Sequence, residues 1–518
     1  MDDTSSSRRI PCSSFFERQH LSFLIIILFF AFLLRTYDLA DNPPGLYIDE
    51  VSSAYNAYSI MKTGMDEHGV SFPLFFEAFG EYRHGLYIYS MIPSLFVFGL
   101  NDFGTRFISV VFGMLSLIVF YYFIRKLFDR NTALLALLFL SIQPWHMHLS
   151  RVAFEGISFV FLFLAGLLFF YRGLTQMQKK WFFVSTIFFV LCLYSYGVAK
   201  LFVPLFVLGL LAVYRHELFQ KDMRKIIAVC AVFFFLLAAP MYYLSFFSDA
   251  NARFQQGSIF VLSEHPVFTF FTNYASHYNP TFLFFSGDAS LRHHIFQWGF
   301  MYYFESILFF FSLLFLWKKR SEKKIQVLFL WLVLFAVPAS FMYGDTPHAL
   351  RTFIGAPLFA LLSALGLFYV WNIFADEKLC TFFCCLVAGI MFLHTAFFIY
   401  NYFVDYKTDS YDYWMAYNEP MLAYAASVRE NYEHVYFSAN SMDRLYVYIL
   451  YYLQTDPAVY QNYGFENATG YGICDLNFCF NETQHNLYVF KGFELKIING
   501  SHQIYYPDNK TIAVKFVG

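Results

Sequence analysis

The chain has 518 residues, of which 58% are hydrophobic and only 14% are charged. Soluble domains are nearer one quarter charged, so this composition excludes an ordinary soluble protein and indicates a polytopic membrane protein. The formal net charge is −2, so the overall electrostatic field of the protein does not favour binding to a nucleic acid. The 72 phenylalanines and 40 tyrosines suit helix faces against lipid and aromatic belts at its boundaries.

A helix needs about 20 apolar residues to cross a bilayer, and eleven segments of the chain approach that length. The first apolar run lacks a small-residue cleavage site, so we expect a retained span and not a removed signal peptide. We expect a transmembrane region over residues 1–404. The predicted spans are 20–36, 104–124, 131–149, 156–171, 181–198, 200–214, 226–247, 299–317, 325–343, 351–374 and 379–402.

Clusters of lysine and arginine decide the orientation of these spans. They precede the first span and follow the second, fourth, sixth and eighth, so they fall on every second loop. The positive-inside rule therefore places the N-terminus in the cytoplasm. An odd number of spans puts the C-terminal tail on the other side, and we expect a multi-pass protein of the plasma membrane.

The first outer loop, residues 37–103, carries two further helical segments. The run 86–100 is apolar but only fifteen residues long and contains Pro93. Counting it as a span would put the later basic loops outside, so we predict an interfacial or re-entrant helix. Within 51–61, apolar residues recur at helical spacing with polar residues opposite, and Gly64 supplies a stop. We therefore expect two helices lying on the membrane.

The tail, residues 405–518, is polar and contains several extended runs together with a helix-like stretch over 442–454. This pattern predicts a small extracytoplasmic α/β or α+β domain. Four Asn-x-Ser/Thr sequons and a cysteine pair fit an exposed, oxidising location. These residues are Asn467, Asn481, Asn499, Asn509, Cys474 and Cys479.

An acidic pair, Asp49-Glu50, lies just beyond the first apolar run, at the end of the segment Asn42-Pro-Pro-Gly-Leu-Tyr-Ile-Asp-Glu50. Carboxylates at a membrane boundary cost free energy to bury, so their presence there indicates a function. With the predicted orientation, the pair faces the outer leaflet. A lipid-linked substrate with a polar head could be attacked at that leaflet.

Several cations are predicted to share that outer face. Lys200 lies between two apolar runs with no acidic neighbour in sequence, and Arg351 begins a span just after His348. Each could be a snorkelling or interfacial anchor, and each could bind a phosphoryl oxygen. Because these cations accompany a carboxylate pair on one face, phosphate binding is the preferred interpretation.

The histidine spacings do not favour a metal site. His146 and His148 are two residues apart and His293 and His294 are adjacent, whereas zinc signatures such as His-Glu-x-x-His have other spacings. We expect no cofactor, with a divalent metal left open. The chain also has no P-loop and no dinucleotide-binding glycine motif, which disfavours a nucleotide-driven pump.

The first-loop segment Asn42–Gly64 resembles the start of the polyprenyl-phosphate-dependent membrane glycosyltransferases. These are GT-C fold enzymes related to the dolichyl-phosphate-mannose protein mannosyltransferases and the lipid A aminoarabinose transferases. The sequence departs from that pattern at Arg83-His84-Gly85, where related chains often carry a basic residue and prolines. No Trp-Trp-Asp motif of the oligosaccharyltransferases is present. Further resembling blocks are Asp66-Glu-His-Gly, Phe79-Gly-Glu-Tyr82, Gln143-Pro-Trp-His, Pro347-His-Ala-Leu-Arg351 and Tyr451-Tyr-Leu-Gln-Thr-Asp-Pro457.

The resemblance implies a catalytic acidic residue, which maps onto Asp49. A carboxylate near an acceptor hydroxyl can take its proton as general base while the hydroxyl attacks the anomeric carbon. Such a single displacement inverts the anomeric configuration. Glu50 could orient Asp49 or bind sugar hydroxyls, or it could simply cap the following helix.

The negative charge of the leaving phosphate must be stabilised, and preorganised cations at an interface that excludes water do this best. The expected donor is a polyprenyl-phosphate sugar, and the acceptor is a hydroxyl or phosphate on protein, lipid or a surface glycan. Mannose is the default sugar of the resembling family. The candidate substrate-binding residues are Lys200, Arg351, His348, Arg151, Arg292, Arg83 and Tyr82.

Two other functions account for some of these features. A secondary transporter or lipid flippase would place charges in mid-membrane within broken helices and show internal repeats, whereas here the charges cluster at span ends. A non-catalytic sensor with an outer tail leaves the first-loop block unexplained. The sequence therefore favours a glycosyltransferase, with the transporter as the alternative.

Overall fold

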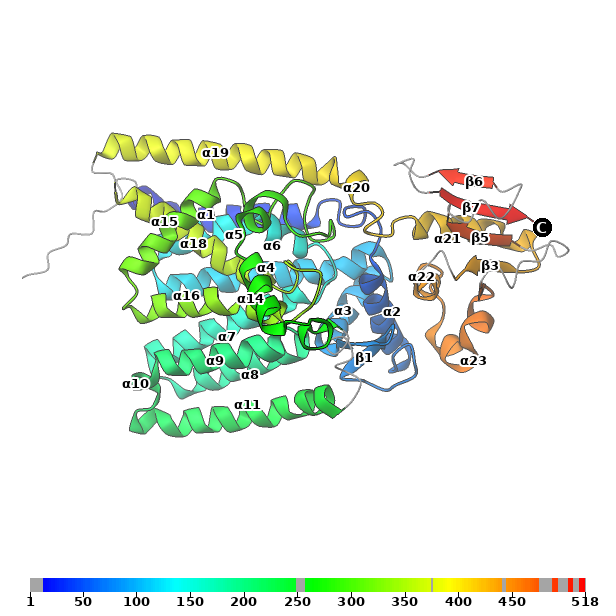
Figure 1. Ribbon diagram of the computed structural model, residues 1–518, viewed down its shortest axis with the longest axis horizontal. Coiled ribbons are helices and arrows are strands. Elements are labelled where there is room, and N and C mark those ends of the chain that lie inside the picture. The colour runs from blue at the N-terminus through cyan, green and yellow to red at the C-terminus, as the bar shows by residue number, and fades with distance from the viewer. Residues whose placement is uncertain are drawn as a thin grey trace, which may run out of the picture.

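In the computed structural model a bundle of long apolar helices makes up the larger part of the chain, and a smaller mixed part lies at one end of it (Figure 1). The elements of the first loop, α2 (Ile48–Thr63), β1 (Phe75–Ala78) and α3 (Gly85–Phe98), lie between the two parts. The structure describes residues 13–247, 257–373, 376–439, 444–474, 487–491, 502–505 and 512–517.

A helix lies in each of the eleven ranges predicted to span the membrane. Seven segments of the described residues are long and apolar enough to cross a membrane, and others, such as α5 and α9, are shorter. The number of spans therefore remains a prediction. The bundle helices are α1 (Ser13–Thr36), α4 (Asp102–Leu127), α5 (Arg130–Ile142), α7 (Gly156–Gln176), α8 (Lys179–Ser195), α9 (Ala199–Val213), α11 (Lys221–Phe247), α15 (Glu305–Lys318), α16 (Lys323–Leu334), α18 (Ala356–Trp371) and α19 (Glu377–Phe403).

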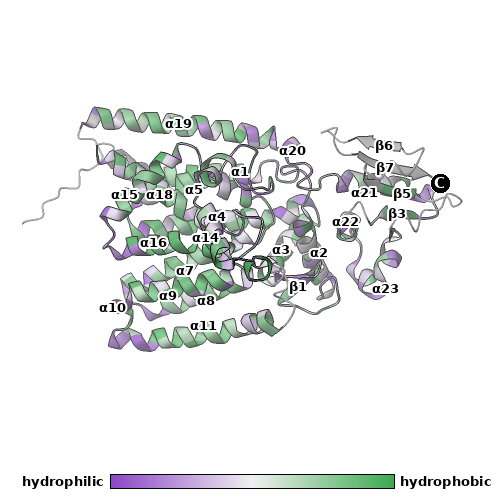
Figure 2. Cartoon of the chain, in the orientation of Figure 1, coloured by the Kyte–Doolittle hydropathy of each residue, from purple (hydrophilic) through white to green (hydrophobic). Residues whose placement is uncertain are grey.

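The outermost helices of the bundle turn apolar side chains outward. Phe235 of α11 and Phe392 of α19 are each 71% exposed, and Figure 2 shows both helices as predominantly hydrophobic. A soluble protein would not leave such surface in water, so this surface suits contact with lipid. In contrast, α7 and α18 are buried along most of their length.

Short helices connect the bundle at both ends. At the end farthest from the tail, α10 carries Glu217, which pairs with Lys323 at the start of α16 (Figure 1). Several basic residues of the loops lie at this end, as the alternation of charge predicted. The short elements are α6 (Pro144–Leu149), α10 (Arg215–Leu218), α13 (Ile259–Leu262), α14 (Pro266–Ser276), η2 (Thr281–Ser286), α17 (Val337–Ser340) and η3 (Phe353–Gly355).

Both helical segments predicted in the first loop are present as α2 and α3. The α2 helix begins after Tyr47, whose backbone N–H donates to Glu50 at 2.9 Å as in a capping box, and it ends at Gly64 with φ +73°. Between α2 and α3, β1 pairs antiparallel with β2 (Glu81–His84). This hairpin brings Arg83 back to Asp49 at the start of α2.

The tail contains a five-stranded sheet of order β4-β3-β5-β7-β6. β3 is parallel to β4 and β5, whereas β7 is antiparallel to β5 and β6. The helix predicted over 442–454 appears as α22. The tail elements are α20 (Tyr406–Asp409), α21 (Asn418–Val428), η4 (Arg429–Asn431), β3 (Val435–Ser438), α22 (Leu445–Tyr452), α23 (Pro457–Thr469), β4 (Gly472–Cys474), β5 (Leu487–Lys491), β6 (His502–Tyr505) and β7 (Ile512–Val517).

The cysteine and sequon predictions for the tail are covered in part by the described residues. Cys474 is disulfide-bonded, and Asn467 of α23 is exposed. The remaining members, Cys479 and the sequons at 481, 499 and 509, lie outside the described residues.

The tail packs against α2, whereas the sequence predicts that α2 lies on the membrane. Tyr55 of α2 donates to the Thr455 carbonyl at 3.1 Å, and Gln461 of α23 donates to the Asp66 carbonyl at 2.7 Å. Ser52 and Asn56 of α2 are also buried, and the Asn56 amide donates to Glu67 of the first loop at 2.9 Å. The tail and the first loop thus form one packed unit.

Candidate active site around Asp49

Asp49 lies in the first turn of α2 and pairs with Arg83 of β2. The distance from the Arg83 Nη2 to the Asp49 Oδ1 is 2.5 Å, and Arg83 Nη1 also donates to the Asp49 backbone carbonyl at 2.7 Å. The Asp49 side chain remains 33% exposed and the Arg83 side chain 15% exposed. The predicted catalytic carboxylate is therefore ion-paired and reachable from the surface.

Arg292 approaches the same helix start from a different segment of the chain. Its guanidinium carbon lies 4.0 Å from the centroid of the Tyr47 ring, two residues before Asp49. Burial and the Asp49 carboxylate together raise the pKa of Tyr47, so its hydroxyl stays protonated. The backbone carbonyl of Arg292 also bonds to the His148 ring at 2.8 Å, which fixes this loop against α6. Arg83 and Arg292 thus both lie near the start of α2.

The tail contributes a third cation near this position. Phe79, in the turn of the hairpin, has the Arg83 guanidinium 5.8 Å from its ring centroid and the Arg444 guanidinium 4.8 Å from it. Arg444 was not among the predicted site residues. Its position just before α22 gives no local signal, because only the packing of the tail on the first loop brings it to Phe79.

Glu50, the second member of the acidic pair, is fully buried. It accepts from Arg106 Nε at 3.1 Å, from Arg106 Nη2 at 3.2 Å and from the Ala153 backbone N–H at 2.7 Å, in addition to its bond from Tyr47. Both of its oxygens are therefore engaged inside the protein. This geometry supports the capping alternative and offers no open oxygen for a sugar hydroxyl, whereas the orienting of Asp49 by Glu50 stays a prediction.

Arg151 is also fully buried. Its terminal nitrogens donate to the backbone carbonyls of Leu34 at 2.7 Å and Asn42 at 2.8 Å, and its guanidinium lies over the Tyr402 and Phe403 rings. These contacts join α1, the first loop and α19. In this structure Arg151 holds the scaffold together, and contact with a substrate would require breaking those bonds.

Lys200 lies on the other side of the hairpin from Asp49. Its Nζ donates to Ser245 at 2.7 Å and lies 5.0 Å from the Phe75 ring centroid, and Phe75 is paired with His84. Burial and the Lys200 charge hold the pKa of His84 well below its usual range, so the ring is neutral. Consecutive strand residues point to opposite faces, so Arg83 and His84 separate Asp49 from Lys200. Tyr82, directly opposite Glu77, is partly buried.

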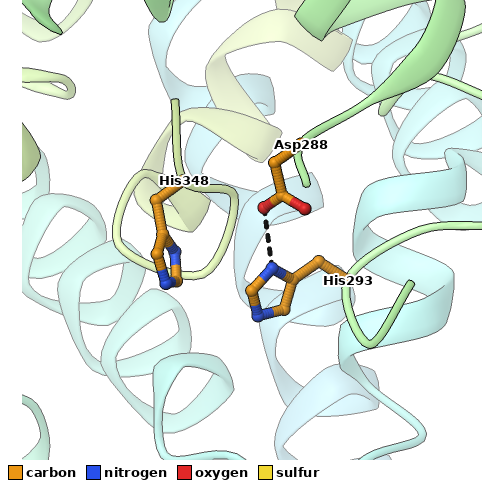
Figure 3. A group of neighbouring side chains, drawn as sticks. All are labelled: Asp288, His293 and His348. Carbon is orange, nitrogen blue, oxygen red and sulfur yellow. Dashed lines mark hydrogen bonds and ion pairs between the residues drawn. The ribbon is translucent and has the colours of Figure 1, made fainter. Parts of the chain in front are cut away.

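His348 and Arg351 belong to a neighbouring cluster of ionisable side chains. The His348 ring approaches Asp345 at 3.5 Å and Arg351 approaches the same carboxylate at 3.8 Å. Figure 3 shows His348 beside His293 and Asp288, with a 2.7 Å bond between the last two. Burial would raise the pKa of Asp288, but His293 and the hydrogen bonds to the carboxylate outweigh it, and the pKa is lowered. Arg292 links this cluster to Tyr47.

Glu67 offers a test of how the first loop packs. Burial raises the pKa of this carboxyl to about 7, and among the described residues its Oε1 accepts from Asn56 at 2.9 Å while Oε2 has no hydrogen-bond partner. The folded protein therefore holds the Glu67 proton more tightly than the unfolded chain, so this contribution to stability is lost as pH rises through about 7.

We expect Glu67→Gln, which is neutral at every pH, to gain stability relative to wild type as the pH is raised from about 5 to 8. Thermal unfolding of both proteins across that range measures the difference, which cancels titrations that the two share. A difference that stays constant with pH would show that Glu67 does not titrate in this way.

A cavity of about 450 Å³ lies at the other end of the bundle, where α4 and α7 finish. Basic residues at that end are explained by the positive-inside rule, and no carboxylate lines the cavity. The chemistry available at the Asp49 end, a partly exposed carboxylate among arginines, is absent from this lining. The cavity is lined by Tyr122, Arg125, Lys126, Leu168, Arg172 and Gln176.

Comparison with known proteins bears on this geometry. Residues 85–243 match the family described as dolichyl-phosphate-mannose-protein mannosyltransferase. No curated protein sequence matches the chain. The matched residues run from α3 through α11 and so exclude the acidic pair itself, whose assignment remains a prediction.

Solved structures with the same fold cover nearly the whole chain. ArnT from Cupriavidus metallidurans in the apo state superposes with a TM-score of 0.55 at 12% identity, covering 96% of this chain and 98% of ArnT. ArnT bound to undecaprenyl phosphate gives a TM-score of 0.54 at 13% identity, covering 95% and 98%. The archaeal oligosaccharyltransferase AglB from Archaeoglobus fulgidus, in complex with an inhibitory peptide and a dolichol-phosphate, gives 0.52 at 14% identity, covering 84% of this chain and 64% of AglB.

Proposed function

We propose that this chain, which has the GT-C glycosyltransferase fold and a mannosyltransferase-family segment at 85–243, transfers a single sugar from a polyprenyl phosphate to an acceptor hydroxyl. The observation that carries the proposal is the partly exposed Asp49 carboxylate, held by Arg83 at the start of α2 with Arg292 close by. A base and cations side by side are what this displacement needs.

In the proposed reaction the acceptor oxygen attacks the anomeric carbon of the sugar, and Asp49 takes the hydroxyl proton. The bond between the anomeric carbon and the phosphate oxygen breaks, and polyprenyl phosphate leaves with the electron pair. The positive charges of Arg83 and Arg292 stabilise the negative charge of that phosphate. A single displacement of this kind inverts the anomeric configuration, and no nucleotide is consumed because the donor is already activated.

The proposed donor class is supported by the ligands of proteins with this fold. ArnT has been solved with undecaprenyl phosphate, and AglB with a dolichol-phosphate. The acceptor is a hydroxyl or phosphate on protein, lipid or a surface glycan, with mannose as the default sugar of the matched family. We place the reaction on the outer side of the plasma membrane, since the Asp49 end lies opposite the basic end of the bundle.

A flippase or transporter is the second candidate, and a single experiment separates the two. The purified protein in liposomes receives a polyprenyl-phosphate sugar labelled in the sugar, with hydroxyl-bearing peptides, lipids or water as acceptor. The proposal predicts that label leaves the polyprenyl phosphate and appears on the acceptor or as free sugar. Movement of intact donor between leaflets without cleavage would support the flippase instead.

Arg83 gives a further prediction for the phosphate site. We expect Arg83→Gln to lower kcat/KM for the donor roughly 10- to 150-fold, the equivalent of losing one charge-assisted hydrogen bond of about 1.5–3 kcal/mol. Arg83→Lys should recover part of the loss. Arg320→Gln, at the exposed opposite end, is the matched control. Unchanged donor kinetics in a stably folded Arg83→Gln would remove this residue from the phosphate site.

A further inference from the structure

Three side chains with metal-binding groups meet beside the proposed active site. Asp288 and His293 come from the segment after η2, and His348 comes from the turn before η3, so they lie on separate segments of the chain. One potential ligand atom from each lies within 4.8 Å of the others. Figure 3 shows the carboxylate and both rings directed into the same small region.

We propose that Asp288, His293 and His348 bind a divalent transition-metal ion, with zinc as the ion to test. Two imidazoles and one carboxylate are a recurrent ligand set for zinc and other first-row metals, and a water or substrate oxygen can complete the coordination. All three side chains are nearly shielded from solvent, with the Asp288 side chain 3% exposed and those of His293 and His348 6% and 9% exposed. A buried carboxylate needs an oppositely charged or hydrogen-bonding partner, and a bound metal ion is one such partner.

The surroundings already orient Asp288 and His348 as metal ligands are oriented in known sites. The Ala349 backbone N–H donates to Asp288 Oδ2 at 2.9 Å, and the His294 ring bonds to the Asp288 backbone carbonyl at 2.9 Å. The Arg351 backbone N–H approaches His348 Nδ1 at 3.4 Å, which turns Nε2 of that ring away from its own backbone.

Only small movements are needed to close a coordination sphere. Ligand atoms at 2.0–2.2 Å from a tetrahedral zinc lie roughly 3.3 Å apart. The Asp288–His293 pair is at 2.7 Å and the cluster extends to 4.8 Å. Rotation of the rings within the existing turns would even out these distances. Without a metal, the same contacts would serve as a hydrogen-bonded carboxylate–imidazole pair, which is the alternative that the experiment must exclude.

The position of the cluster assigns the metal a positioning role in the proposed reaction, and this role rests on the proposed function. Arg292 directly precedes His293, and Arg351 follows His348 by three residues. An ion joining the two segments would therefore fix the backbone of both arginines. Arg292 would be held over Tyr47, beside Asp49. The metal is thus inferred to position phosphate-binding arginines, without touching the transferred sugar.

The test measures zinc bound to the purified full-length protein, so it does not depend on sugar transfer. Protein stripped with a chelator and reloaded with zinc should bind one tightly held ion per chain. His348→Gln and His293→Gln should weaken zinc binding at least about tenfold, whereas the exposed His265→Gln should match wild type. Asp49→Asn should also retain zinc, which separates failure of this inference from failure of the proposed function.

A second measurement covers the case in which the histidine variants misfold. X-ray absorption at the zinc edge of the reloaded wild-type protein should show two imidazole nitrogens with oxygen ligands and no sulfur. Zinc that is absent from wild type, equal in wild type and a folded His348→Gln, or bound by sulfur would overturn the proposal.

Discussion

Replacing Asp49 with asparagine is expected to slow sugar transfer by roughly 10²- to 10⁴-fold, the usual contribution of a positioned general base. The amide has nearly the same shape as the carboxylate but cannot take the acceptor proton. Donor binding should change far less than kcat, because the cations near Asp49 remain in place. Rates measured with saturating donor, together with direct binding of polyprenyl phosphate, separate these two quantities.

The control for this variant is Asp41→Asn, which neutralises an exposed carboxylate of the same loop. It should transfer sugar at close to the wild-type rate. Because Asp49→Asn also removes the ion-pair partner of Arg83, thermal stability must be compared alongside. A well-folded Asp49→Asn that retains more than about half of wild-type kcat would exclude the general-base role.

Replacing Arg106 with methionine is expected to destabilise the protein by about 3–5 kcal/mol, the usual result of removing one partner from a buried ion pair. Arg106 and Glu50 are both fully buried and are paired at 3.1 Å. Arg106 also donates to the Pro43 carbonyl at 2.7 Å and to the Gly45 carbonyl, so it anchors the segment before α2. The methionine side chain would leave the Glu50 charge and these carbonyls without partners.

Unfolding of the purified protein in detergent or bicelles measures this loss. The double variant Glu50→Gln/Arg106→Met should recover part of the stability, because it removes the unpaired charge along with its partner. Arg320→Met, a surface change at the opposite end, should unfold as wild type does. If Arg106→Met were as stable as wild type, the pair would not hold the start of α2.

The helices of the bundle could be predicted from sequence because a long apolar run with basic ends leaves few alternatives in a membrane. The surroundings of α2 could not be predicted in the same way. Its pattern of apolar and polar residues is that of a helix with one solvated face, yet Ser52 and Asn56 are buried, and Tyr55 and Ser59 form hydrogen bonds with the tail. The contact partners, Thr455 and Gln461, are some 400 residues away, beyond any local pattern.

In the candidate site, too, some contacts could be predicted from sequence and others could not. Asp49 and Arg83 belong to one block of sequence, and a two-stranded hairpin suffices to bring them together. Arg106 lies inside a predicted span and gives no sign that its partner is Glu50. Arg444 reaches Phe79 only through the packing of the tail. Spacing also fails to reveal the cluster of Asp288, His293 and His348, because its ligands come from separate loops.

The position of the donor phosphate tests the central claim most directly. A structure of the protein in lipid with bound polyprenyl phosphate should place the phosphate within about 4 Å of the Arg83 guanidinium, the range of an ion pair, with Asp49 beside it. A phosphate bound instead in the cavity lined by Arg125 and Arg172, or anywhere that neither Asp49 nor Arg83 can reach, would contradict the account.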